Sequence, residues 1–177
     1  MISLVPFLLD ILKFIIAGSA IFFIAYNVLK SEFEINRQMK ILDLRKSAQG
    51  TTLPLRLQAH ERIVLFIERI NPSSLLVRTH TPGLTVVQMQ QMLTTEIQNE
   101  FQHNVTQQVY LSVQAWVMVR RLKDDTINLI NQSAKTLDPE APSLELSKLV
   151  LTHMASIEDN PYDAALALIK ADIQEIF

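Results

Sequence analysis

The pattern of hydrophobic and polar residues divides the chain into an apolar N-terminal stretch and a longer part with helical periodicity. In the first thirty residues, apolar side chains surround the whole of the expected helix instead of forming one stripe. The uncharged run from Phe14 to Leu29 spans about 24 Å of helix, short of a bilayer core of about 30 Å. Extended back to Leu4, with Asp10 and Lys13 near one interface, the helix reaches about 39 Å. We therefore expect residues 1–30 to form a transmembrane anchor and prefer this to a buried helix or a cleaved signal peptide.

The flanking charges predict the topology of this anchor. No Lys or Arg precedes Asp10, whereas five basic residues follow the apolar run between positions 30 and 46. The positive-inside rule then places the N-terminus outside and the rest of the chain in the cytoplasm, at a bacterial inner membrane. Asp10 and Lys13 share one helix face. We expect an intramembrane charged pair that serves a proton or ion path, contacts a partner helix or lies at the outer interface.

Residues 31–50 continue the helix, because neither Gly nor Pro occurs between Ser19 and Gln49. This segment would form a stalk or lie on the membrane surface as an amphipathic helix. Gly50 stands where a helix-terminating glycine is expected. The pattern thus predicts three parts, with residues 51–177 as a cytoplasmic helical domain.

Residues 51–177 show the pattern of an antiparallel bundle of about five helices. Helix starts are indicated by proline or by residues that cap helix N-termini. An extended stub is expected over 107–111, and TPG at 81–83 is expected to form a turn. The expected starts are Pro54, Asn71-Pro72, Thr85-x-x-Gln88, Ser112, Ser143 and Asn160-Pro161.

Apolar residues at helical spacing predict the faces that these helices bury. The expected core residues are Ala59, Ile63, Phe66, Ile67, Ile70, Met89, Leu93, Ile97, Phe101, Ala115, Val119, Leu122, Thr126, Leu129, Leu146, Leu149, Val150, Ile157, Tyr162, Leu166, Ile169, Ile173 and Phe177. The fold class is therefore all-α: a transmembrane helix, a possible stalk and a bundle.

The composition and the absence of known motifs argue against several kinds of site and partner. The chain has no Cys, which excludes disulfides and thiolate metal sites, and its net charge of −2 argues against nucleic acid as a partner. None of its four His has a His partner at metal-ligand spacing, and no phosphate-binding or nucleophile motif occurs. We expect no metal, no cofactor, no small-molecule substrate and no catalytic residue.

One surface patch is a candidate interface. Trp116 with Arg120 and Arg121 combines residue types that anchor protein interfaces, and the segment holding Leu75, Leu76 and Arg78 would complete the patch. The alternative is a core tryptophan followed by a solvated basic turn.

Three stretches together, LPLRLQAHERIVLFIERINPSSLLVR (53–78), EFQHNVTQQVYLSVQAW (100–116) and EDNPYDAALALIKADIQEIF (158–177), are distinctive as a set. The chain resembles an uncharacterised family of small single-pass membrane proteins of the Bacteroidota. That family usually has a Tyr where His60 stands and an acidic residue where Gln114 stands. The resemblance implies the architecture and no activity.

These observations favour a membrane-anchored interaction protein, a non-catalytic subunit or adaptor of a cell-envelope complex. Its partners would be membrane lipid and other membrane or envelope proteins, including a second copy of the chain. An alternative is a component of an ion-coupled or transport assembly that uses Asp10 and Lys13. A third hypothesis is an enzyme with a shallow polar site.

Overall fold

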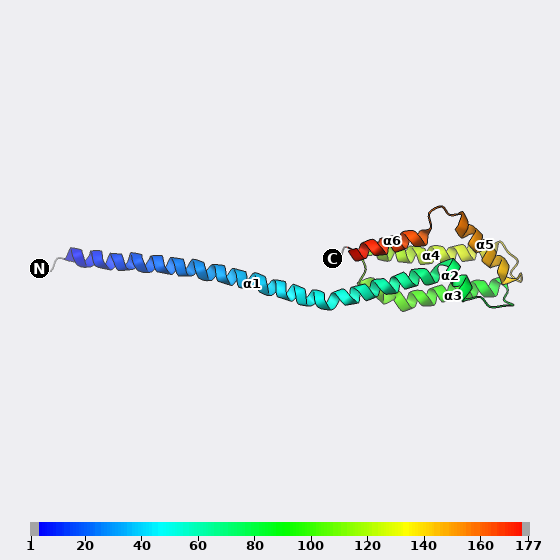
Figure 1. Ribbon diagram of the computed structural model, residues 1–177, viewed down its shortest axis with the longest axis horizontal. Helices are drawn as coiled ribbons and strands as arrows, with labels where there is room; N and C mark the ends of the chain where they lie inside the picture. The colour runs from blue at the N-terminus through cyan, green and yellow to red at the C-terminus, as the bar shows by residue number, and fades with distance from the viewer. Residues whose placement is uncertain (1–3, 175–177) are drawn as a thin grey trace. The chain divides into compact units, whose positions relative to one another are not determined.

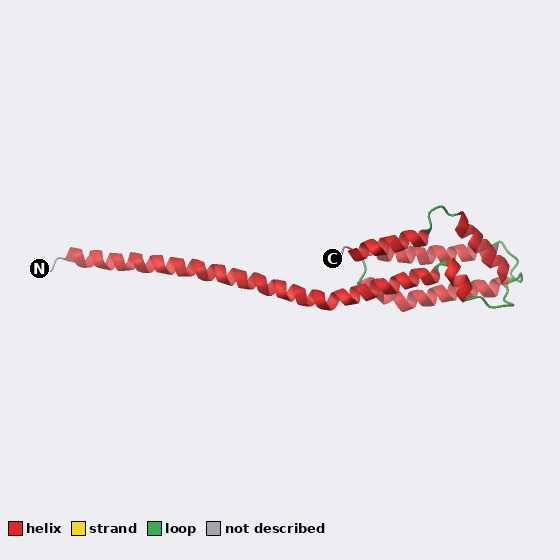
Figure 2. Ribbon diagram, viewed as in Figure 1, coloured by secondary structure: helices red, strands yellow, loops and turns green. Residues whose placement is uncertain are grey.

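The computed structural model describes residues 4–174, with the side chains of 4–10, 20, 27, 28, 31, 35, 36, 45, 48 and 49 outside the description. Every regular element within these residues is a helix (Figures 1 and 2), as predicted. The helices are α1 (Leu4–Ile70), α2 (Pro72–Arg78), α3 (Val86–Asn104), α4 (Val113–Lys135), α5 (Ser143–Ser156) and α6 (Pro161–Gln174). A short 3-10 helix, η1 (Val105–Val109), lies between α3 and α4.

The chain divides into two compact units, Met1–Thr51 and Thr52–Phe177. In the first unit, the described part of α1 exposes large apolar side chains along its length, among them Phe14, Phe22 and Phe33. The second unit holds the hydrophobic core and all the other helices.

The helix end predicted at Gly50 is wrong, because α1 runs on through Gly50 and Pro54 to Ile70. Pro54 has no N–H to donate to the carbonyl of residue 50, four positions earlier, and this normally interrupts a helix. Gly50 is exposed, so water has access to the carbonyl that lacks a partner. The loss is therefore one intrahelical hydrogen bond at a solvated position.

The predicted transmembrane anchor is also wrong. Among the residues that the structure describes, no helix combines the length and the apolar character that crossing a membrane requires. The physical reason lies in the position of the charges. The uncharged run from Phe14 to Leu29 spans roughly 24 Å of helix, less than the roughly 30 Å of a bilayer core, and α1 continues beyond it with charged residues. The predicted location in the inner membrane, as a single-pass protein with its N-terminus outside, depended on this anchor and is wrong as well.

Side chains predicted to cap helices in the second unit do so at four starts. Asn71 Oδ1 accepts from the Ser73 N–H at 3.1 Å, and Asn160 Oδ1 accepts from Tyr162 N–H at 2.9 Å. Ser112 Oγ accepts from the Ala115 N–H at 3.1 Å. Each cap satisfies a backbone donor that the first helical turn leaves unpaired.

The capping box before α3 is complete. Thr85 Oγ1 accepts from the Gln88 N–H, while Gln88 Oε1 accepts from the Thr85 N–H at 3.1 Å. The preceding turn holds Gly83 at φ +84°, a conformation that glycine adopts without steric cost.

Two local predictions are corrected. The segment 107–111 is not extended, because η1 and the hydrogen bond from Tyr110 N–H to the Gln107 carbonyl close it into a turn. Ser143 is not the cap of α5 but its first residue, and its N–H donates to the Leu84 carbonyl at 3.0 Å. That bond belongs to the contact in which Thr85 and Pro142 form an isolated antiparallel bridge between the starts of α3 and α5.

The core of the second unit lies among all of its helices. α3 packs against α4 and α5, α4 also packs against α5 and α6, and α2 packs against α5. The last turns of α1 join α3 through Phe66 and Phe101, whose ring centroids are 6.0 Å apart. Most predicted core residues are buried, with Phe101, Leu129, Leu166 and Ile173 partly buried.

Two core predictions are wrong and one is untested. Leu149 and Ile157 are each 36% exposed, because the buried face of α5 is formed by Leu146 and Val150, and Ile157 follows the end of the helix. Phe177 lies outside the described residues.

Candidate functional site

An acid–base cluster joins α1, α2 and α3. Glu100, on α3, has only 8% of its surface exposed. Its Oε1 lies 2.8 Å from Nη1 of Arg69 on α1 and 3.3 Å from Nη1 of Arg78 on α2. Arg78 also lies 3.3 Å from Glu96 and donates through Nη2 to the Arg69 carbonyl. One nearly buried carboxylate therefore faces two guanidinium groups, which offset the cost of its burial.

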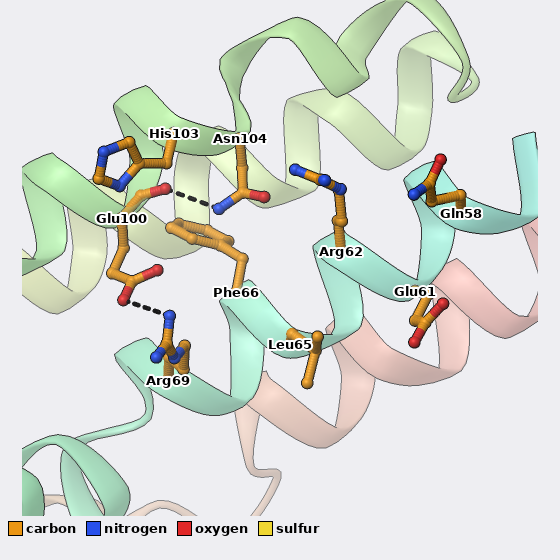
Figure 3. A pocket seen from close by; sticks show the side chains of 9 residues that line it. All are labelled: Gln58, Glu61, Arg62, Leu65, Phe66, Arg69, Glu100, His103 and Asn104. Atoms are coloured by element: carbon orange, nitrogen blue, oxygen red, sulfur yellow. Dashed lines mark hydrogen bonds and ion pairs between the residues drawn. The ribbon is translucent and has the colours of Figure 1, made fainter. Parts of the chain in front are cut away.

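A hollow of about 420 Å³ opens beside this cluster, between α1 and α3 (Figure 3). Phe66 supplies buried apolar surface and Leu65 exposed apolar surface, while the remaining side chains are polar. The lining residues are Gln58, Glu61, Arg62, Leu65, Phe66, Arg69, Glu100, His103 and Asn104.

The two arginines that line this hollow differ in whether they form an ion pair. Arg69 is paired with Glu100. Arg62 is exposed, and within the described part of the chain it has no hydrogen-bond or ion-pair partner. In Figure 3, Arg62 points toward the α3 side of the hollow and Glu61 points the opposite way. The hollow thus presents an unoccupied guanidinium to whatever enters it.

A second polar pair lies inside the bundle. His60 on α1 is fully buried, with Nε2 at 2.8 Å from Oδ2 of Asp172 on α6 and Nδ1 at 2.7 Å from the Arg56 carbonyl. Each ring nitrogen lies within hydrogen-bond distance of an oxygen atom. The Ser112 N–H, at the start of α4, also donates to Asp172 Oδ2 at 3.1 Å. Burial raises the pKa of Asp172, but the hydrogen bonds from Ser112 and His60 outweigh it and hold the pKa below its ordinary value.

A third polar contact lies beside a smaller hollow of about 210 Å³ between α4, α5 and α6. The Tyr162 hydroxyl and Thr126 Oγ1 are 2.6 Å apart and buried. Burial raises the pKa of Tyr162 to about 12, with Asp125 adding to the rise and the Thr126 hydrogen bond opposing it. The phenol is therefore neutral at physiological pH and forms a structural contact.

The structure separates the residues of the predicted interface. Leu75 and Leu76 are buried in the core and are not available on the surface, so this part of the patch is wrong. They form the apolar face by which α2 packs on α5. Arg78 belongs to the Glu100 cluster.

On α4, Trp116 is partly buried and stacks on Phe101, with 5.5 Å between ring centroids. Arg120 and Arg121 are exposed, and Arg121 pairs with Asp125 at 3.5 Å. Val113 and Val117 are exposed and lie about two turns and one turn, respectively, before Arg120 and Arg121. The surface that remains of the predicted patch is therefore on α4 alone.

The predicted charged pair lies in the first part of α1. Lys13 is exposed. The side chain of Asp10 lies outside the described residues. Because no described helix crosses a membrane, the intramembrane role of this pair is withdrawn. Among the described residues there is also no group of three or more His, Asp or Glu that could hold a metal ion.

Comparison with known proteins gives one result. Residues 6–176 match a family described as a family of unknown function, DUF7935. The chain belongs to this family. The expected resemblance to an uncharacterised family is confirmed to that extent, and DUF7935 brings no activity with it. No curated protein and no solved structure matches the chain.

Two arrangements of this DUF7935 chain escaped the sequence reasoning. His60 stands directly beside Ala59 on the apolar stripe of α1, and Asp172 stands between the core positions of α6. A polar residue on a buried helix face needs a hydrogen-bond partner, and this requirement could have suggested that His60 and Asp172 pair with each other. The Glu100 cluster has no such signal, because charged residues are common at the surface of helices.

Proposed function

We propose that this protein is a non-catalytic interaction protein, a subunit or adaptor that holds other polypeptides through the first part of α1. The supporting observation is the exposure of its apolar side chains between Ile11 and Leu44. Phe14 is 78% exposed, and Phe22 and Phe33 are each 72% exposed. Apolar side chains exposed to this extent mark a surface that another polypeptide covers.

A second contact surface on α4 supports the same function. Val113 is 80% exposed and Val117 is 56% exposed, with Arg120 and Arg121 beside them. An apolar centre with arginine at its rim is a common composition of protein interfaces. Two separate surfaces would allow one chain to join two partners, which is what an adaptor does.

That the family comes from the Bacteroidota stays a prediction.

The test compares the proteins that co-purify with the full chain from its own cells. Phe22→Gln with Phe33→Gln removes apolar surface, and Lys30→Gln with Lys40→Gln is the matched control on exposed positions of the same helix. We expect wild type and control to retain the same stoichiometric partners and the phenylalanine variant to lose them. Recovery of identical partners from all three proteins, with helix content unchanged by circular dichroism, would rule out this surface.

The α4 surface is tested in the same way. Arg120→Glu with Arg121→Glu should remove a different partner from the one lost in the phenylalanine variant, with the fold unchanged. If the charge reversal changes no partner, the α4 surface has no part in the function.

A further inference from the structure

We propose that the hollow between α1 and α3 is a binding site for a carboxylate attached to an apolar body, with Arg62 as the residue that binds the anion. The proposal rests on the residues that line the hollow and is independent of the apolar surface of α1 and of the function proposed above. The proposal follows from which charged side chains of the hollow already form ion pairs within the protein.

Arg62 is the cation available to a ligand. Arg69 is held by Glu100 at 2.8 Å, whereas Arg62 has no partner within the described residues. Its guanidinium lies on the side of the hollow where α3 contributes His103 and Asn104 (Figure 3). A planar guanidinium offers two parallel N–H donors, which match the two oxygens of a carboxylate.

Asn104 is oriented by its own hydrogen bond. Its Nδ2 donates to the Glu100 carbonyl at 2.8 Å. His103 is exposed at the rim, where an imidazole nitrogen can donate to a bound anion. The polar side of the hollow thus holds the Arg62 guanidinium, with the His103 imidazole at the rim.

The two glutamates of the hollow leave the charge of Arg62 uncompensated. Glu100 is paired with Arg69 and Arg78 and adds little net charge. Glu61 is exposed and points away from Arg62 (Figure 3). A carboxylate carries a single charge, which matches the single charge of Arg62, whereas a phosphate monoester carries between one and two at neutral pH. The balance of charge therefore favours the carboxylate.

The apolar lining selects the body of the ligand. Leu65 is 54% exposed and gives the hollow apolar surface that a ligand can contact, while Phe66, one turn after Arg62, is buried beneath the hollow against Phe101. The volume of about 420 Å³ accepts a ring or a branched aliphatic group beside the carboxylate. Such a group comes from a free small acid or from the C-terminus of a peptide.

The experiment titrates the full chain with benzoate, phenyl phosphate and N-acetylphenylalanine and follows the Arg62 and Asn104 side-chain signals by NMR. Arg62→Gln removes the charge at an exposed position, and Arg120→Gln is the matched control, since Arg120 does not line the hollow. Thermal unfolding of each variant checks that the fold is retained.

We expect saturable binding of benzoate that weakens at least about tenfold in Arg62→Gln and is unchanged in Arg120→Gln. Tighter binding of N-acetylphenylalanine than of benzoate would identify a peptide terminus as the source of the carboxylate, and the reverse order a free acid. Absence of saturable shifts, equal affinity of wild type and Arg62→Gln, or tighter binding of phenyl phosphate than of benzoate would overturn the proposal.

Discussion

His60 and Asp172 are 112 positions apart in the sequence and meet inside the bundle, with 2.8 Å between Nε2 and Oδ2. The contact joins α1 to α6, and the Ser112 N–H brings the start of α4 to the same carboxylate. Three helices are therefore fixed to one another at a single buried oxygen atom.

Removing the carboxylate should destabilise the bundle. Asp172→Ala leaves the Nε2 of His60 buried without an acceptor, so we expect a loss of about 3 kcal/mol in the free energy of unfolding. Asp172→Asn keeps an oxygen for the Ser112 N–H and should lose roughly half as much. Urea unfolding followed by circular dichroism measures both. Lys170→Ala, exposed on the same helix, is the control, and an equal effect of Asp172→Ala and Lys170→Ala would contradict the prediction.

The same contact should depend on pH. The pKa of Asp172 in the folded chain is below its ordinary value of 3.8, so its ionised form stabilises the fold at any pH above about 4. As the pH falls through the lowered pKa, the carboxylate is protonated and this contribution is lost. We expect the difference in unfolding free energy between wild type and Asp172→Asn to shrink as the pH falls below about 4. A difference that does not change down to about pH 2 would contradict it.

Tyr162 should titrate late on the alkaline side. Its pKa is raised from 10.0 to about 12, mainly by burial, so the neutral phenol contributes stability that is present below pH 10 and lost as the pH rises through 12. Absorbance of tyrosinate should show a step near pH 12 that is absent in Tyr162→Phe. The alkaline loss of stability should be shallower in that variant.

Replacing glycine by alanine should have opposite effects on stability at two positions. Gly83 has a φ of +84°, and an added Cβ would meet nothing within 4 Å, so Gly83→Ala should cost about 1 kcal/mol through backbone strain alone. Gly50 lies inside α1, also in open space, and Gly50→Ala should raise helix stability by about 0.5–1 kcal/mol. Thermal unfolding and helix content by circular dichroism measure the two. Stabilisation by Gly83→Ala would show that the turn tolerates a side chain.

The sequence predicted most of the local structure of residues 51–177 because helix starts depend on neighbouring residues. Asn71, Thr85, Ser112 and Asn160 each cap a helix through atoms two or three positions away. Where the local signal was ambiguous the prediction was wrong. A proline usually ends a helix, yet α1 continues through Pro54 and loses only the hydrogen bond to the exposed Gly50 carbonyl.

The candidate site was beyond local reasoning. Whether Leu75 and Leu76 face solvent or core depends on where α5 packs, and this is set by residues about 70 positions away. The pairing of Glu100 with two arginines depends likewise on how α1, α2 and α3 meet. The apolar N-terminal stretch was misjudged for a different reason, because the predicted span was long enough only if Asp10 and Lys13 were placed at one membrane interface.

The joining of α1 to α6 also has a consequence for biosynthesis. A ribosome that adds about 5–20 residues per second incorporates Asp172 roughly 6 to 22 s after His60. Throughout that interval the nascent chain holds His60, and the apolar stripe of α1 around it, without the helix that will cover them. The second unit therefore completes its interior only after α6 has been made, and the growing chain offers chaperones an apolar helical face for several seconds.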